Sequence, residues 1–170
     1  MVISDFGTAL PIVEKQGLKQ QVKEKEADML DSLMKIGAYR VEHFENINQV
    51  DVEAFGFYIR GELQEDAAYS WDAKAQLYAG LMMIHSKALM GHLRGIYVDV
   101  DSIENLQRPA YLQMKADLLA GLFKRILVLD EAALSGSEAA KADLLKVYIA
   151  IGGFTLLVCR NGECEPCPFF

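Results

Sequence analysis

Apolar side chains recur at three- and four-residue steps along much of the chain, which is the spacing of amphipathic α-helices. Between residues 18 and 47, Leu30, Leu33, Val41 and Phe44 form such a stripe, with charged residues between them. We therefore expect one long helix over this range. A helix is also expected directly after it, because helical spacing continues at Val52, Phe55, Ile59 and Leu63.

A longer helix is predicted from Ser70 to Gly95. Its core-facing stripe is Leu77, Leu81, Ile84 and Ala88, widened by Tyr78, Met82 and Leu89. The β-branched run from Ile96 to Val100 then predicts a short strand.

The most apolar segment runs from Pro109 to Leu134 and predicts a central helix, because leucine, isoleucine and phenylalanine cover about half of its circumference. A last helix should begin at the Ser137 cap and continue to about Ile151, where Gly152 and Gly153 interrupt it.

These elements together predict a mostly α fold, a bundle of five to seven helices to which a small C-terminal β-hairpin can be added. A chain of 170 residues is usually one domain. We therefore expect a single helical domain over residues 1–170, with residues 1–16 as an N-terminal arm. Residues 154–170 should form a hairpin or an extended tail.

Composition narrows the classes of partner. The net charge of −7 repels phosphate, so general nucleic-acid binding is not expected. No apolar stretch reaches the ~18 residues of a membrane span, and the N-terminus has no secretory pattern, so we expect a cytoplasmic protein. Apolar residues make up 52% of the chain, which favours burial against a protein partner or a second copy.

The three cysteines lie close together near the C-terminus, as Cys159, Cys164 and Cys167. Clustered thiolates bind zinc or iron, and a Cys-x2-Cys pair also permits redox chemistry. A fourth ligand is missing from this cluster, so the metal site is the weaker of two interpretations.

The other interpretation of the cysteines is a structural hairpin. Asn161 and Gly162 suit a two-residue type I′ turn. Such a turn places Arg160 opposite Glu163 and Cys159 opposite Cys164, with Cα atoms about 4.5 Å apart. The two thiols would then be close enough for a disulfide, although a reducing cytosol would keep them separate.

Histidines offer little for catalysis. His85 and His92 lie seven residues apart on the predicted helix, about 10.5 Å along its axis, which is too far to chelate one ion as a pair. We interpret them as core or interface histidines; a pocket for an apolar ligand around them remains the other option. The sequence contains no nucleophile elbow or phosphate loop, and no cofactor is expected.

Contact surfaces have better support than catalytic sites. Met83 and Met90 lie seven residues apart on an otherwise polar face, and Phe169 and Phe170 form an apolar end. Methionine suits adaptable interfaces, although a neighbouring helix could equally cover the pair.

The sequence therefore predicts a non-enzymatic interaction or assembly protein, acting through apolar surfaces in a homo-oligomer or a larger complex. A virion or head–tail component and an acidic inhibitor are examples of this class. The alternative is a metal- or redox-dependent helical protein that uses the cysteine cluster.

Overall fold

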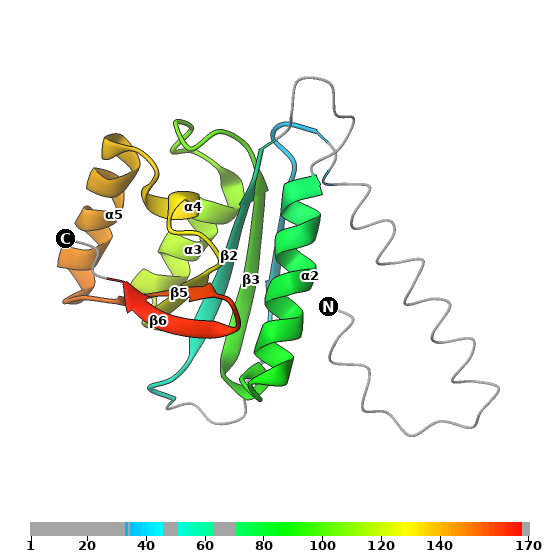
Figure 1. The fold of residues 1–170 in the computed structure, drawn as a ribbon. Helices are drawn as coiled ribbons and strands as arrows, with labels where there is room; N and C mark the ends of the chain where they lie inside the picture. Colours follow the sequence, from blue (N-terminus) through cyan, green and yellow to red (C-terminus); the bar gives the residue numbers. More distant parts are fainter. Residues whose placement is uncertain (1–32, 34, 46–50, 63–70, 168–170) are drawn as a thin grey trace.

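The computed structural model describes residue 33 and residues 35–45, 51–62 and 71–167. Within these residues the chain forms one six-stranded sheet with helices on both faces (Figure 1). The spatial order of the strands is β1-β3-β2-β4-β5-β6. Their bounds are β1 (Tyr39–His43), β2 (Phe55–Gly61), β3 (Leu93–Val100), β4 (Arg125–Val128), β5 (Thr155–Arg160) and β6 (Glu163–Cys167).

The four central strands are parallel, and β1 and β6 pair antiparallel at the two edges. Parallel neighbours need crossover connections, and helices provide them. These helices are α2 (Trp71–Ser86), α3 (Pro109–Leu119), α4 (Ala132–Ser135) and α5 (Glu138–Ile151), with a short 3-10 helix, η2 (Met90–His92). Figure 1 shows α2 on one face of the sheet and α3 and α5 on the other.

The predicted all-helical bundle is therefore wrong, and the described residues form an α/β fold with a mixed sheet. The clearest error concerns the helix expected from Val52. Residues 54–59 are apolar without a break and almost fully buried, as is usual for a parallel strand covered on both faces. The helical spacing of Phe55 and Ile59 is a by-product of that run.

Three other predicted helices also contain strands. Residues 39–43 of the long N-terminal helix are β1. The apolar segment from Pro109 to Leu134 divides into α3, β4 and α4, because Gly121 has a φ of 80° and takes the chain out of the helix. The segment from Ser70 to Gly95 is helical only to Ser86, and β3 begins at Leu93.

Some elements follow the sequence pattern. The strand expected over Ile96–Val100 is confirmed as part of β3. The last helix is confirmed as α5: the Ser137 side chain accepts a hydrogen bond from the Ala140 N–H at 3.1 Å, and Gly152 ends the helix in the left-handed conformation.

Two hydrophobic cores lie on opposite faces of the sheet. The α2-side core contains Phe57, Ile59 and Val98 from the strands and Leu77 and Ile84 from α2. The α3-side core takes the alternate strand residues, and its members include Tyr58, Tyr97, Met114, Leu118 and Leu144. Alternation along β2 and β3 thus divides the apolar residues between the two faces.

The predicted arm over residues 1–16 and the end of the predicted tail, including Phe169 and Phe170, lie outside the described residues. In the part of the chain that the structure covers, every helix is too short or too polar to reach across a bilayer.

Candidate functional site

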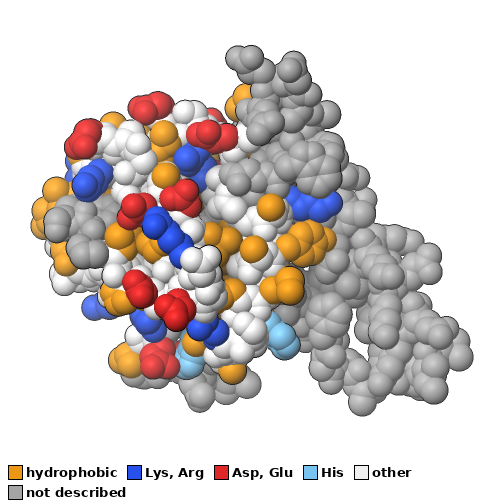
Figure 2. All heavy atoms as spheres, viewed as in Figure 1, with side chains coloured by type: hydrophobic (Ala, Val, Ile, Leu, Met, Phe, Trp, Pro, Cys, Tyr) orange, Lys and Arg blue, Asp and Glu red, His pale blue; other side chains and the backbone are white. Residues whose placement is uncertain are grey.

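The outward face of α2 is apolar and uncharged. It consists of Ala75, Tyr78, Ala79 and Met82, which follow the i, i+3, i+4, i+7 spacing of one helix face. All four are exposed; Tyr78 retains 44% of its accessible surface and Met82 retains 73%. We call these four residues the α2 face. Figure 2 shows hydrophobic side chains gathered over this helix.

The sequence pattern assigned Tyr78 and Met82 to the core-facing side of this helix, and the structure corrects that assignment. Leu77 and Ile84 are buried as expected, but Ala88 is exposed beyond the helix end. The buried positions of α2 are Ala73, Leu77, Gly80 and Ile84, and at 100° per residue Tyr78 and Met82 lie on the other side of the helix.

A second apolar surface lies on the opposite side of the sheet, at α3. Leu112, Ala116 and Leu119 share one helix face, and Ala120 and Leu122 extend it. Leu119 is 55% exposed and Leu122 is 42% exposed. We call these five residues the α3 face. A surface patch with several large apolar side chains is characteristic of a contact site.

The structure separates the three cysteines of the predicted cluster. Cys159 of β5 and Cys164 of β6 form a disulfide, and Cys167 takes no part in it. The predicted hairpin register is confirmed: Cys159 pairs with Cys164, Arg160 pairs with Glu163, and Asn161 and Gly162 both have positive φ, as a type I′ turn requires. The thiols are joined here, not separate as expected for a reducing cytosol.

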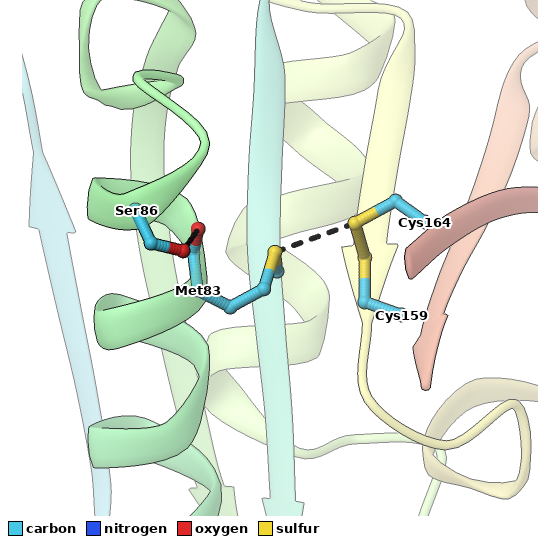
Figure 3. The surroundings of a disulfide bond; sticks show 4 residues. All are labelled: Met83, Ser86, Cys159 and Cys164. Atoms are coloured by element: carbon cyan, nitrogen blue, oxygen red, sulfur yellow. Dashed lines mark hydrogen bonds between the residues drawn. A yellow bond between two sulfur atoms is a disulfide. The ribbon is translucent and has the colours of Figure 1, made fainter. Parts of the chain in front are cut away.

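The three sulfur atoms do not converge on one point. Figure 3 shows the disulfide beside Met83 of α2, whose sulfur lies 3.4 Å from the Cys164 Sγ atom. Cys167 packs against the α3-side core instead. Its thiol donates a hydrogen bond to Glu131 at 3.0 Å, which raises the pKa of Cys167. A thiol held protonated in this way is a poor nucleophile and a poor metal ligand.

Among the described residues, no group of three histidine, cysteine or acidic side chains is arranged to hold a metal ion. A hollow of about 420 Å³ lies beside the hairpin and contains three glutamates, Arg160 and the Cys167 thiol. Glu131, one of the three, already accepts from Cys167 and lies 3.7 Å from Arg160. Glu131, Arg160 and the Cys167 thiol therefore contact one another within this hollow.

The histidines are placed apart. His85 is exposed at the end of α2. The His92 ring lies between two carboxylates, with Nδ1 2.8 Å from Asp51 and Nε2 3.3 Å from Glu53. Arg94 donates to the same Asp51 oxygen at 2.6 Å. The hydrogen bond from His92 is the main reason that the pKa of Asp51 is lowered.

His43 belongs to a different cluster of polar side chains, on the edge strand β1. Its Nε2 atom lies 2.7 Å from Asp117 Oδ2, and the Tyr97 hydroxyl donates to the same oxygen at 2.5 Å. Burial, reinforced by this hydrogen bond, raises the pKa of Tyr97. The phenol therefore remains a donor, and the group fastens α3 to β1 and β3.

Of the predicted interface methionines, Met83 and Met90 are partly buried against the α2-side core. Among the described methionines, Met82 is the exposed one, and the sequence pattern had placed it on the core-facing side.

Sequence reasoning missed a buried polar network. Asp99 of β3 and Arg108 are both fully buried, and Tyr58 lies between them: its hydroxyl donates to Asp99 at 2.8 Å and accepts from Arg108 Nε at 3.0 Å. The Asp99 carboxylate also accepts from the backbone N–H groups of Ala110 and Tyr111, so it holds the first turn of α3.

Burial raises the pKa of Asp99, and this effect outweighs its hydrogen bonds. The buried Nη2 atom of Arg108 has no hydrogen-bond partner, but the guanidinium lies 4.4 Å from the Tyr111 ring centroid. That cation–π contact replaces part of the lost hydration. Because these charged groups do not reach solvent, the network positions α3 and is closed to a substrate.

Open α/β sheets usually bind ligands beyond the carboxyl ends of the strands, where the order of connections reverses. Here that point lies between β2 and β4. The Arg60 side chain crosses it and donates to the Asp101 and Ala132 carbonyl oxygens at 3.2 and 3.3 Å. It also pairs with Glu62 at 2.6 Å. Within the described residues, contacts of Arg60 thus take up part of the usual ligand position.

Comparison with known protein families, with characterised proteins and with solved structures finds no match to this chain.

Proposed function

We propose that this chain is a non-catalytic assembly subunit that associates with copies of itself through its apolar helix faces. The observation that carries the proposal is the pair of exposed, apolar surfaces, the α2 face and the α3 face, on opposite sides of the sheet. Exposed leucine, methionine and tyrosine side chains on two helices cost free energy in an isolated subunit, and contact with another surface removes that cost.

The contacts made by four ionisable side chains, those of Asp99, Arg108, Arg60 and Cys167, support the same proposal. Catalysis generally uses ionisable groups that reach a cleft. Here the strongly buried ones, Asp99 and Arg108, hold α3 in place, and Arg60 bonds to backbone carbonyls. Cys167 is held protonated by Glu131. Each of these groups has a structural task.

The proposal is tested by changing one surface at a time. Met82→Glu charges the α2 face and Leu119→Glu charges the α3 face, and light scattering then reports the mass of each variant. We expect at least one substitution to lower the assembly mass relative to the unmodified chain. If both variants keep the same mass as the unmodified assembly, the helix faces are not its contacts and the proposal fails.

A second candidate is a thiol–disulfide function at the β5–β6 hairpin, favoured by the Cys159–Cys164 disulfide. A dithiol reductant would attack Sγ of Cys164, the less buried residue of the two, and Cys159 would leave as a thiolate. The second thiol of the reductant would then release Cys164, so that two electrons pass to the protein. Equilibration with dithiol buffers of graded potential, followed by thiol counting, tests this candidate: a hairpin that stays oxidised throughout would eliminate it.

A further inference from the structure

We propose that two copies of this chain pair through α2, with the two helices antiparallel about a two-fold axis that passes between Tyr78 and Ala79. This inference rests on the proposed function and names the occupant of the α2 face: the same face of a second copy. It also assigns the contacts residue by residue.

The order of large and small side chains on the α2 face is self-complementary. In a contact with two-fold symmetry, a residue i of one copy that faces residue j of the other has a symmetric counterpart: residue j of the first copy faces residue i of the second. An axis between Tyr78 and Ala79 sets Tyr78 against Ala79 of the second copy, and Ala75 against Met82. Every large side chain therefore meets a small one, the arrangement that lets two helices interdigitate closely.

Charge favours the same surface. Each copy carries a net charge of −7, so two copies repel one another over most of their surfaces. From Ala73 to Ser86, however, α2 contains no aspartate or glutamate, and Lys74 is its one lysine or arginine. The one acidic residue of α2, Asp72, lies in its first turn, six residues before Tyr78. Contact through α2 thus brings two acidic subunits together without placing carboxylates against each other.

The α2 face is also rigid before contact. Leu77 and Ile84 on the inner side of α2 are buried, and Gly80 lets the helix lie directly on Phe57. A surface held in its bound form loses little conformational entropy on association.

The size of the contact sets its expected strength. A helix of 16 residues is about 24 Å long, and one helix pair buries less than the roughly 1,600 Å² of a standard interface. We therefore expect a dimer that depends on concentration, with a dissociation constant on the order of micromolar or weaker.

Cross-linking with matched cysteines tests the register. Ala75→Cys and Met82→Cys are made separately in a Cys167→Ser background, and one of the two chains carries a mass tag. The proposed pairing places residue 75 beside residue 82 of the second copy, whereas two copies of residue 75 lie about 10.5 Å apart along the axis. Mild oxidation should therefore give the mixed dimer at least several-fold more than either like dimer. Equal yields of all three dimers, or no mixed dimer, would overturn the pairing.

A charge substitution with a matched control gives an independent result. Ala79→Glu places a carboxylate beside the axis, where its copy in the second chain lies close to it. Ala142→Glu makes the same change at an exposed alanine of α5. We expect Ala79→Glu to weaken the dimer at least tenfold and Ala142→Glu to leave it within about twofold.

The outcomes separate this inference from the proposed function. If Ala79→Glu leaves the assembly intact while Leu119→Glu dissolves it, the α2 pairing is wrong and assembly through the α3 face stands. If the unmodified chain has the mass of one copy at every concentration, both the pairing and the proposed function fail.

Discussion

Gly80 of α2 lies directly against the ring of Phe57 on the sheet, with no room between them for a Cβ atom. Phe57 is fully buried in the α2-side core, so its ring has little freedom to move away. This contact limits how far α2 can stand from the sheet, and it lies on the inner side of the helix, away from the exposed α2 face.

Gly80→Ala should therefore destabilise the fold. The added methyl group overpacks the core at a typical cost of 1–3 kcal/mol, partly offset by the higher helix propensity of alanine, about 1 kcal/mol. We expect a net loss of about 1 kcal/mol in denaturant unfolding. Gly91→Ala is the matched control, because a Cβ atom there meets nothing within 4 Å, and it should be nearly neutral.

Tyr58→Phe should also lower stability, because it removes the hydroxyl that bonds to both Asp99 and Arg108. Leaving a buried donor of Arg108 unpaired costs about 1–3 kcal/mol. Tyr39→Phe removes the same atom from an exposed tyrosine of β1 and should change little. Thermal melts of the two variants measure the difference; equal melting temperatures would contradict the structural role of the network.

The disulfide should stabilise the hairpin by about 2 kcal/mol, the loop-entropy value for so short a ring. Unfolding with and without a dithiol reductant measures this contribution. A Cys159→Ala/Cys164→Ala variant should resemble the reduced protein and should not respond to the reductant. Thiol counting on the unmodified folded chain should give one thiol, Cys167; a count of three would show that the hairpin is reduced.

The lowered pKa of Asp51 predicts a specific dependence of stability on pH. A carboxyl group whose folded pKa is depressed stabilises the fold above its unfolded pKa, about 3.9, and this contribution is lost as pH falls through the lower folded value. Asp51→Asn should therefore flatten the fall in stability below about pH 4. His92→Ala removes the main cause and should raise the pKa of Asp51, as carboxyl NMR titration would record. An unchanged pKa would contradict the hydrogen bond.

Sequence reasoning succeeded where local chemistry decides the structure. The type I′ turn at Asn161 and Gly162 fixes which residues pair across the hairpin, so the Cys159–Cys164 register could be deduced from a few residues. The start and end of α5 depend in the same way on Ser137 and Gly152.

Sequence reasoning failed where a strand is buried on both faces of the sheet, because such a strand lacks the alternation of polar and apolar residues. Residues 55–59 of β2 are apolar at every position, and helical spacing can be found in such a run by chance. β4 has four residues and lies between two apolar helical segments, so nothing in its composition separates it from them. Gly121 was the one local indication of the break.

The candidate site was only partly accessible to the same reasoning. The excess of apolar residues indicated contact surfaces, but Met82 could not be told apart from a core methionine before the orientation of α2 was known. The Tyr58–Asp99–Arg108 network depends on residues 41 to 50 positions apart, a relationship that no short motif records.

Sedimentation equilibrium of the intact, unmodified chain, from about one micromolar to about one millimolar, tests the central claim most directly. If the exposed helix faces are contacts between copies, the weight-average mass rises with concentration above the 18.9 kDa of one chain. A mass that stays at 18.9 kDa over the whole range would contradict it.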